Sequence, residues 1–245
     1  MFKYTAKENS LKGKIILVTG AGAGIGKEAS LTYAKLGATV ILLGKTVSKL
    51  ESVYDEIVAL NLSEPAIIPL DLKGATKQNY IDMSATIASQ FGKLDGVLLN
   101  ASMLGELTPF TQIHEQIFND VMNINVTAQY LLAQALIPTL QLAEHASLIF
   151  TSSGVGSQGR AYWGAYSISK FATVGMMQVI ADEYENSNLR TNAINPGATN
   201  TNMRASAYPA EDKDKLAKTT DIMPLYVYLM SDDSLEINGQ TIKAQ

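Results

Sequence analysis

The fold of this chain is decided by residues 14–26, which read KIILVTGAGAGIG. The first six residues are mostly apolar and β-branched, so they predict a short buried strand. Apolar residues at helical spacing over 27–36, with Gly37 as a natural helix end, place the glycines between a strand and a helix. Glycine lets the backbone approach a pyrophosphate closely, and a helix N-terminus supplies unpaired N–H groups to it. We therefore expect a dinucleotide to bind at Gly20, Gly22, Gly24, Ile25 and Gly26.

A tight structural turn is the simpler alternative for this loop, and it stays open at this point. The phosphate-binding loop of ATPases and GTPases is disfavoured, because it needs glycine, four further residues and then Gly-Lys-Ser/Thr. Here Gly26-Lys27 is followed by Glu28, and the residue five before Gly26 is Ala21.

Apolar runs and helical patterns alternate along the whole chain, which has no repeat, low-complexity stretch or linker. This alternation predicts an α/β fold, with one domain over residues 1–245 and a doubly wound parallel sheet of about seven strands covered by helices on both faces. The strands are expected at 14–19, 38–43, 66–70, 95–100, 147–151, 189–194 and 240–243. The helices are expected near 24–36, 46–60, 76–91, 112–136, 163–186 and 222–230.

Polar or small residues that follow the strands should converge, because ligands of parallel sheets bind at the carboxyl ends of the strands. The residues in these places are Thr19, Gly44, Asp71, Asn100, Ser152, Ser153, Pro196 and Gly197. We therefore expect them to surround one crevice, although they are scattered in the sequence.

Bulk composition excludes several classes of protein. A hydrophobic content of 47% and a charged content of 17% are typical of a soluble globular protein. The net charge of −4 gives no reason to expect nucleic acid or an anionic membrane as a partner. No cysteine is present, and the two histidines, His114 and His145, lack ligand spacing, so disulfides, thiolate catalysis and a metal site are not expected. No stretch approaches the about 20 apolar residues of a membrane span, and we expect a cytoplasmic protein.

The residues best suited to chemistry are Tyr166 and Lys170, with Ser153 thirteen residues before the tyrosine. Residues four apart share one face of a helix. A cation beside a phenol favours the phenolate, so we expect a lowered pKa for Tyr166 and a role as general acid and base. The Ser153 hydroxyl is suited to hold a substrate oxygen against it. Taken alone, the pattern is more often a surface tyrosine beside a solvated lysine, because Tyr-x-x-x-Lys recurs by chance on many amphipathic helices. No Gly-x-Ser-x-Gly motif points to a serine hydrolase.

The joint pattern Thr19-Gly20-x-x-x-Gly24-Ile25-Gly26, Ser153 and Tyr166-x-x-x-Lys170 resembles the classical branch of the short-chain dehydrogenase/reductase family. The resemblance extends over nearly the whole chain through Asn100-Ala101, Asn125 and Pro196-Gly197 with Thr201. Within this family, the chain resembles most closely the YciK-like bacterial oxidoreductases. The segments that carry this narrower resemblance are residues 41–44, 95–98, 163–166, 203–207 and 221–226. The resemblance implies a Rossmann fold and an enzyme that interconverts a carbonyl and an alcohol. It does not identify the substrate.

The resemblance also implies roles for individual residues. Tyr166 exchanges a proton with the substrate oxygen, Lys170 lowers the pKa of Tyr166, and Ser153 orients that oxygen. Asn125 holds a water that connects Lys170 to solvent, with a helix-packing amide as an equal alternative.

The expected cofactor is NADPH/NADP+ rather than NADH/NAD+. Gly44 stands where NAD-preferring relatives carry Asp, and Lys45 is a cation suited to the 2′-phosphate, unless it is only a solvated loop charge. The remaining cofactor contacts implied by the resemblance are Asp71, Leu72, Asn100, Ala101, Tyr166, Lys170, Pro196, Gly197, Thr199 and Thr201. For Asp71, a place at a helix start near Thr76 is nearly as good an explanation.

The substrate is expected to be a small or medium, partly apolar carbonyl or alcohol, with Tyr162 and Trp163 lining its pocket. Met103, Leu104 and Leu107 fit a pocket, the core or a subunit interface equally well, and residues 202–218 are suited to form a lid. Ser102 departs from the family pattern, because a glycine usually follows Asn-Ala and a Cβ atom restricts positive φ.

A homodimer or homotetramer is expected through the helices near 112–136 and 163–186. The second of these helices offers an apolar, close-packing face of Phe171, Val174, Gly175, Met177 and Gln178. The alternative function is a non-catalytic NADP(H)-binding or sensing protein of the same fold. A sugar dehydratase or epimerase is disfavoured, because such enzymes usually come from longer chains.

Overall fold

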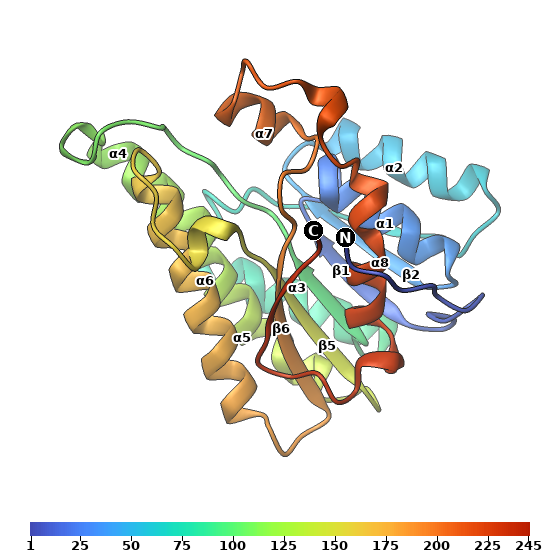
Figure 1. Cartoon of the computed structure of the whole chain (residues 1–245). Helices are drawn as coiled ribbons and strands as arrows, with labels where there is room; N and C mark the ends of the chain where they lie inside the picture. Colours follow the sequence, from blue (N-terminus) through green and yellow to red (C-terminus); the bar gives the residue numbers. More distant parts are fainter.

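Seven parallel strands form one sheet in the order β3-β2-β1-β4-β5-β6-β7 in the computed structural model, which describes residues 1–245 (Figure 1). Every pair of neighbouring strands runs parallel. The predicted α/β fold with a doubly wound parallel sheet is therefore confirmed. The strands are β1 (Ile15–Thr19), β2 (Thr39–Gly44), β3 (Ala66–Pro69), β4 (Gly96–Leu99), β5 (Ala146–Thr151), β6 (Leu189–Asn195) and β7 (Thr241–Lys243).

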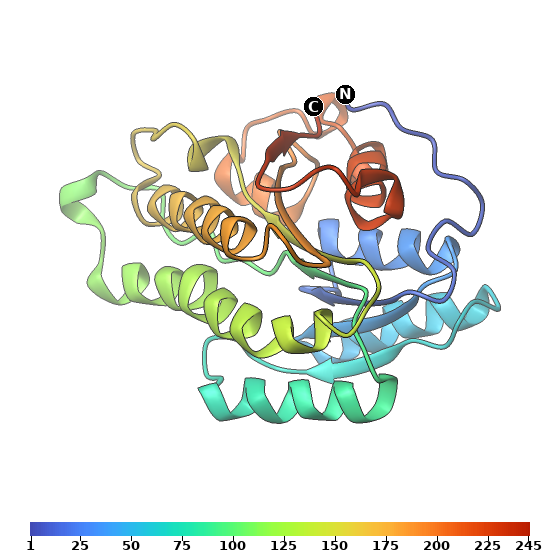
Figure 2. The same cartoon turned by 90° about the horizontal axis from the view of Figure 1, so that it is seen from below.

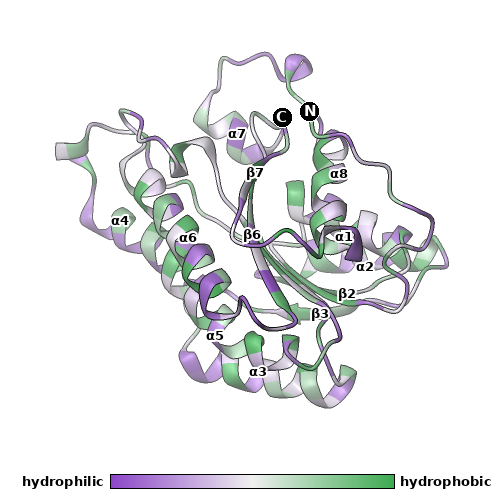
Figure 3. Cartoon of the chain, turned by 60° about the horizontal axis from the view of Figure 1, so that its bottom comes forward, coloured by the Kyte–Doolittle hydropathy of each residue, from purple (hydrophilic) through white to green (hydrophobic).

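Helices cover both faces of the sheet (Figure 2). The helices are α1 (Gly24–Lys35), α2 (Val47–Ala59), α3 (Lys77–Phe91), α4 (Glu115–Met122), α5 (Ala128–Leu140), α6 (Gly164–Glu183), α7 (Asn202–Ala207) and α8 (Thr219–Met230). One core cluster joins α1, α2 and α8 to the sheet, and a second joins α3, α5 and α6 to it. Figure 3 shows the matching hydropathy, with green along β2 inside the molecule and purple mainly on loops and outward turns of helices.

The strand order reverses between β1 and β4. The chain runs outward from β1 to β3 and then returns to place β4 on the other side of β1. At such a switch point the loops that follow the two central strands part and leave a crevice at the carboxyl ends of the strands. Those ends point toward the top of Figure 1, where α7 lies.

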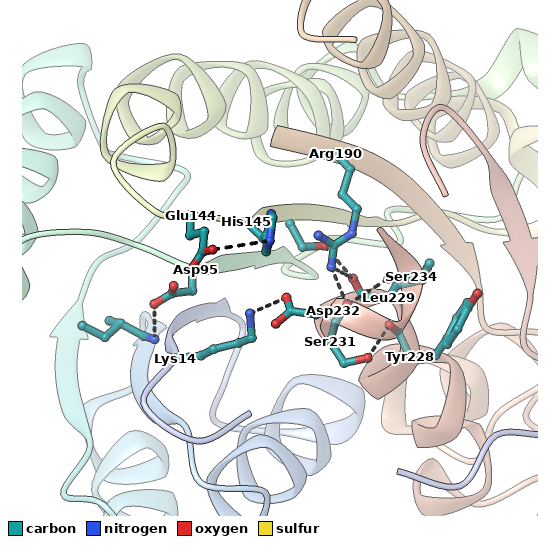
Figure 4. A network of polar contacts seen from close by, with 12 residues as sticks. Lys14, Asp95, Glu144, His145, Arg190, Tyr228, Leu229, Ser231, Asp232 and Ser234 are labelled. Carbon is teal, nitrogen blue, oxygen red and sulfur yellow. Dashed lines mark hydrogen bonds and ion pairs between the residues drawn. The ribbon is translucent and has the colours of Figure 1, made fainter. Parts of the chain in front are cut away.

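At the other end of the sheet, where the strands begin, a polar network closes the fold (Figure 4). Arg190 at the start of β6 is buried and donates to the carbonyl oxygens of Leu229 (3.3 Å) and Ser231 (2.6 Å). These carbonyls belong to the C-terminal end of α8, where backbone acceptors lack helical partners and a cation is favoured. Lys14 pairs with Asp232 at 2.7 Å beside them. The network therefore joins α8 to the sheet at the amino ends of the strands, and the crevice lies at their carboxyl ends.

Two parts of the chain differ from the sequence-based expectation. The expected long helix over 112–136 is divided into α4 and α5 by a π-helical turn at Asn123–Thr127, and α5 extends to Leu140. A π turn inserts an extra residue, and such turns often mark functional sites. Residues 202–218 contain the short helix α7, which begins at Asn202. It is capped by Thr201, whose side-chain hydroxyl accepts the Arg204 N–H.

Candidate active site

A cavity of about 630 Å³ opens at the carboxyl ends of the strands. Its walls come from the glycine loop, from the ends of β4, β5 and β6, and from α6 and α7. The predicted site residues that line it are Gly20, Gly24, Ile25, Asn100, Ala101, Ser153, Trp163, Tyr166, Lys170, Pro196, Gly197, Thr199 and Thr201. The crevice expected from the sequence is thus present, with both the glycine loop and the Ser–Tyr–Lys set on its wall.

Some predicted site residues do not line this cavity. They are Gly22, Gly26, Gly44, Lys45, Asp71, Leu72, Asn125 and Tyr162. Lys45 and Asp71 are exposed, and Leu72 is buried. Asp71 accepts the N–H of Lys73 at 3.1 Å, while the first turn of α3 is capped by Thr76 rather than by Asp71.

The glycine loop has the shape that a pyrophosphate requires. Gly20 and Gly24 have φ angles of 69° and 54°, a region that favours glycine. A Cβ atom on Gly26 would collide with the carbonyl group of Gly20 and lie 2.8 Å from the Asn100 side-chain nitrogen. The first turn of α1 carries no acidic residue, and no side chain caps it, so its N–H groups are available to an anion. The shape of this loop is therefore better explained by dinucleotide binding than by a purely structural turn.

The far end of the glycine loop meets α2. A Cβ atom on Gly22 would lie 2.8 Å from the Lys49 Cβ atom, and one on Gly44 would lie 3.2 Å from the Leu50 side chain. Lys45 and Lys49 are both exposed, and neither takes part in an ion pair. Two free cations therefore flank the end of β2. The sequence interpretation missed Lys49, because Lys45 lies before α2 and only the packing of α2 against the glycine loop brings Lys49 close to Gly22.

Tyr166 and Lys170 lie side by side on the buried face of α6. The Lys170 Nζ atom is 5.4 Å from the centre of the Tyr166 ring and donates to the Thr151 carbonyl oxygen at 2.8 Å. Tyr166 is 8% exposed and Lys170 is 1% exposed. A surface tyrosine beside a solvated lysine is thereby excluded. Ser153, directly after β5 and Ser152, shares the cavity wall with Tyr166.

The expected lowering of the Tyr166 pKa is not found in this structure. Burial raises the pKa of Tyr166 to about 12, and the hydroxyls of Ser102 and Ser153 are the two groups that lower it. Lys170 is not among the groups that lower it, because burial lowers the pKa of the Lys170 ammonium group itself to about 7. A lysine that is only partly charged at neutral pH, and that donates to a carbonyl oxygen, stabilises a phenolate weakly.

Asn125 lies in the π turn and is fully buried. Its amide donates to the Met103 carbonyl oxygen at 2.8 Å and to the Ser169 hydroxyl at 3.0 Å, and it accepts the Met103 N–H at 2.7 Å. Both amide N–H groups are therefore used to join the 101–103 loop to α6. This geometry supports the packing alternative for the side chain, and a relay water at Asn125 stays a prediction.

The loop after β6 closes the cavity on the side of Pro196, Gly197 and Thr199. The Thr199 hydroxyl donates to the Pro196 carbonyl oxygen at 3.2 Å, and the Gln245 side-chain amide donates to the same oxygen at 2.7 Å. Gly197 has a φ of 74°, and a Cβ atom there would lie 2.8 Å from the Gln245 side chain. The bend at Gly197 therefore requires glycine, and Thr199 is held in place beside the cavity.

The wall beyond Tyr166 is partly apolar. It contains Leu104, Trp163, Met203 and Ala207, of which the sequence interpretation had assigned only Trp163 to the pocket. The ring centres of Trp163 and Tyr166 are 5.7 Å apart. Tyr162 is 61% exposed, with a φ of 71°, and lies outside the cavity wall. Its placement therefore differs from the expected pocket position, because the turn before α6 directs Trp163 inward in its place.

Arg204 also lines this wall, and the sequence interpretation did not single it out. Its guanidinium makes two hydrogen bonds of 2.6 Å to Glu211 and lies 3.9 Å from the centre of the Tyr208 ring. Arg160 donates to the Tyr208 hydroxyl at 2.8 Å. These contacts connect the segment around α7 to the loop before α6.

No group of three or more His, Cys, Asp or Glu side chains is arranged to hold a metal ion. None of the helices combines the length and the apolar character needed to cross a membrane.

Comparison with known proteins gave consistent matches. A model of the family "short chain dehydrogenase" matches residues 14–212. The uncharacterized oxidoreductase YciK of Escherichia coli K12 is 52% identical over 242 residues, which cover 99% of this chain and 96% of the relative. A short chain dehydrogenase of Escherichia coli CFT073 in complex with NADPH has a TM-score of 0.96 and 51% identity, covering 98% of this chain and 100% of that one. A short chain dehydrogenase of Shigella flexneri in complex with NADP matches with the same TM-score, 52% identity and the same coverage.

Proposed function

This chain belongs to the short chain dehydrogenase family of oxidoreductases, and we propose that it uses NADP(H) to interconvert a carbonyl and an alcohol. One observation carries the proposal. Tyr166 and Lys170 are buried side by side in the cavity that also contains Ser153 and the start of the glycine loop. A phenol, an amine and a hydroxyl on one wall, with a dinucleotide loop on the other, form a site for coupled hydride and proton transfer.

The proposed chemistry divides the work among the three side chains. A nicotinamide cofactor bound in this cavity would supply the hydride for reduction and accept it in oxidation. In reduction, Tyr166 gives its hydroxyl proton to the substrate oxygen as the carbonyl carbon gains the hydride, so the product is the alcohol. Ser153 donates a hydrogen bond to the same oxygen and stabilises the negative charge that develops on it. We assign to Lys170, whose Nζ atom lies 5.4 Å from the centre of the Tyr166 ring, the return of a proton toward Tyr166, and its pKa of about 7 suits that exchange near neutral pH.

The preference for NADP(H) over NAD(H) is supported at the end of β2. Gly44 provides no carboxylate there, and Lys45 and Lys49 are two exposed cations without carboxylate partners. An acidic residue in this place would bond the ribose hydroxyls of NAD and repel a 2′-phosphate, whereas cations attract it. The NADPH-bound and NADP-bound relatives, 51% and 52% identical to this chain, also support the proposal.

The apolar part of the cavity supports a partly apolar substrate. Leu104, Trp163 and Met203 lie on its wall beside the three reactive side chains. We propose a small or medium carbonyl compound whose apolar body packs against Trp163 while its oxygen faces Ser153 and Tyr166.

The experiment is carried out in two steps. Titration of the purified protein with NADPH and NADH, followed by cofactor fluorescence, tests the cofactor, and tighter binding of NADPH is expected. NADPH consumption is then measured with a panel of aldehydes, ketones and cyclic carbonyls, with Tyr166→Phe as the inactive control. Binding of NADPH without turnover of any compound, in either direction, would favour a sensing protein over an enzyme.

We also propose that the protein forms a dimer through α5 and α6. Phe171, Gly175 and Val179 follow one another at spacings of four along α6, and Phe171 and Val179 are 46% and 57% exposed. A Cβ atom on Gly175 would meet nothing within 4 Å, so a second helix has room to approach there. Met177, expected on this face, is instead fully buried in the core of the chain, because it faces the sheet.

A further inference from the structure

Ser102 occupies a rigid place between two anchored peptide units. On one side, the Ala101 N–H donates to the Thr19 hydroxyl at 3.0 Å. On the other side, the Met103 N–H and carbonyl oxygen both bond the Asn125 amide, at 2.7 Å and 2.8 Å. Because the backbone on both sides is held, the position of the Ser102 Cβ atom is fixed. Its hydroxyl can rotate only among a few staggered orientations.

The Ser102 hydroxyl has no hydrogen-bond partner of ordinary length within the protein. Its oxygen is enclosed, with essentially no area exposed to solvent. Ser102 nevertheless lines the cavity together with Ser153 and Tyr166. A buried hydroxyl without a partner is unfavourable, so its presence in a reactive cavity calls for an acceptor there. Tyr166 lines the same cavity, and it is the titratable group whose pKa the Ser102 hydroxyl lowers.

We propose that Ser102 is a positioning residue for Tyr166, whose hydroxyl works with that of Ser153 to hold the phenol oxygen and to stabilise it when it loses its proton. The residue expected at this place from the family resemblance is glycine, which has no hydroxyl. The Ser102 hydroxyl therefore adds to the Ser–Tyr–Lys set a group that the expected glycine does not supply.

Electrostatics at the site support this role. Burial raises the pKa of Tyr166, and the neighbouring hydroxyls of Ser102 and Ser153 oppose that rise, with the larger effect from Ser102. Lys170 is not among the groups that lower the pKa of Tyr166, and burial makes its own charge costly. A hydroxyl that donates to a phenolate favours the charged form without bringing a second buried charge into the cavity.

The consequence for turnover rests on the proposed acid/base role of Tyr166, but the effect of Ser102 on the ionisation of Tyr166 can be tested without a substrate. Tyrosine labelled with ¹³C at the ζ carbon reports ionisation of each phenol by NMR. The Tyr166 signal is identified by its loss in Tyr166→Phe, and the labelled protein is titrated from pH 8 to pH 11. The buried Tyr80 on α3, whose pKa burial also raises to about 12, serves as an internal control.

In Ser102→Ala the ionised fraction of Tyr166 at pH 11 is expected to fall by about threefold to tenfold, because a donor to the phenolate is lost. Ser102→Thr keeps a hydroxyl and should restore titration close to that of the native protein. Ser206→Ala, which removes an exposed hydroxyl that bonds only its own helix at Asn202, should change nothing. The Tyr80 signal should be the same in all variants.

Equal titration of Tyr166 in Ser102→Ala and in the native protein, with both folded by circular dichroism, would overturn the proposal. If Ser102→Ala does not fold, Ser102→Gly supplies the same loss of the hydroxyl and the same comparison. A shifted titration in a protein that turns over no carbonyl compound would keep the role of Ser102 and remove only the proposed function.

Discussion

The side-chain nitrogen of Lys170 lies 5.4 Å from the centre of the Tyr166 ring, one helical turn away on α6, and both side chains are buried. The protein surrounds this pair with hydroxyls and carbonyl groups and places no carboxylate in hydrogen-bond contact with the amine, which donates to Thr151. Burial therefore pushes the two groups toward their neutral forms, since it raises the pKa of Tyr166 to about 12 and lowers that of Lys170 to about 7. In its neutral form, Tyr166 can donate a proton, and neutral Lys170 can accept one.

Removal of the Tyr166 hydroxyl should abolish turnover and leave cofactor binding intact. In Tyr166→Phe, kcat is expected to fall at least about 100-fold, because the proton donor to the substrate oxygen is lost. NADPH affinity should stay within about twofold, since the ring still fills its place. Tyr54→Phe is the matched control, because it removes an exposed hydroxyl that bonds Glu64 on the far side of α2. Substantial turnover by Tyr166→Phe, measured by NADPH absorbance, would show that another group transfers the proton.

Lys170→Met should stabilise the protein, most of all at pH 7 and below. The pKa of Lys170 is about 7 in the folded protein and near 10.5 when unfolded, so the unfolded chain binds more protons between these values. The free energy of unfolding of the native protein therefore rises with pH across that window. Below the window, the buried ammonium group of Lys170 lowers the stability of the folded protein. Lys170→Met removes this burden, with a gain of roughly 2 kcal/mol or more at pH 6 that shrinks toward pH 10.

Thermal melts of Lys170→Met at pH 6, 7, 8 and 9 measure this effect, with Lys35→Met at the exposed end of α1 as the control. The difference in Tm from the native protein should decrease as the pH rises. A difference that stays constant over this range would mean that Lys170 does not titrate within it.

The sequence was sufficient to predict the sheet, the glycine loop and the meeting of Ser153, Tyr166 and Lys170, because each rests on local periodicity or on strand ends that must converge. What it could not supply depends on packing. Met177 belongs to the core because of the angle at which α6 meets the sheet. The reversed shift in the Tyr166 pKa depends on how deeply the phenol is buried.

The π turn and the bonds of Asn125 were beyond sequence reasoning for a related reason. The pattern over 112–136 is helical throughout, and no residue type marks where an extra residue is inserted. The insertion is recognisable only when the Asn125 amide is seen to bond Met103 and Ser169, which lie far from it in sequence.

Gly26→Ala should damage both stability and cofactor binding. The added Cβ atom would press on the Gly20 carbonyl group and lie 2.8 Å from the Asn100 side chain, so the loop must shift. We expect a loss of about 1–3 kcal/mol and NADPH binding weakened at least tenfold, or about 1.4 kcal/mol. Gly74→Ala is the matched control, because nothing lies within 4 Å of its Cβ position and its φ is not positive. Native Tm and affinity in Gly26→Ala, measured by melting and fluorescence titration, would refute the close approach at this loop.

Lys45→Glu should exchange the cofactor preference. A carboxylate at the end of β2 repels a 2′-phosphate and can bond ribose hydroxyls, so Kd for NADPH should rise at least about tenfold while Kd for NADH stays equal or falls. Lys49→Ala should weaken NADPH by a smaller factor, about threefold, because a lysine on the first turn of α2 contributes a less directed charge. Fluorescence titrations at two salt concentrations measure both constants, and NADPH binding should weaken with salt in the native protein. If Lys45→Glu leaves the ratio of the two constants unchanged, the phosphate is bound elsewhere.

Val179→Asp should separate the subunits. The exposed stripe of Phe171, Gly175 and Val179 on α6 is apolar and flat enough for a second helix to pack on it, and a buried carboxylate there would be left without a partner. Val58→Asp on α2 is the matched control, because Val58 is 44% exposed on a different face. Size-exclusion chromatography with light scattering at micromolar concentration should show a dimer or tetramer for the native protein and Val58→Asp, and a monomer for Val179→Asp. A native protein that elutes as a monomer under these conditions would contradict the interface at α6, and the apolar stripe would then need another explanation.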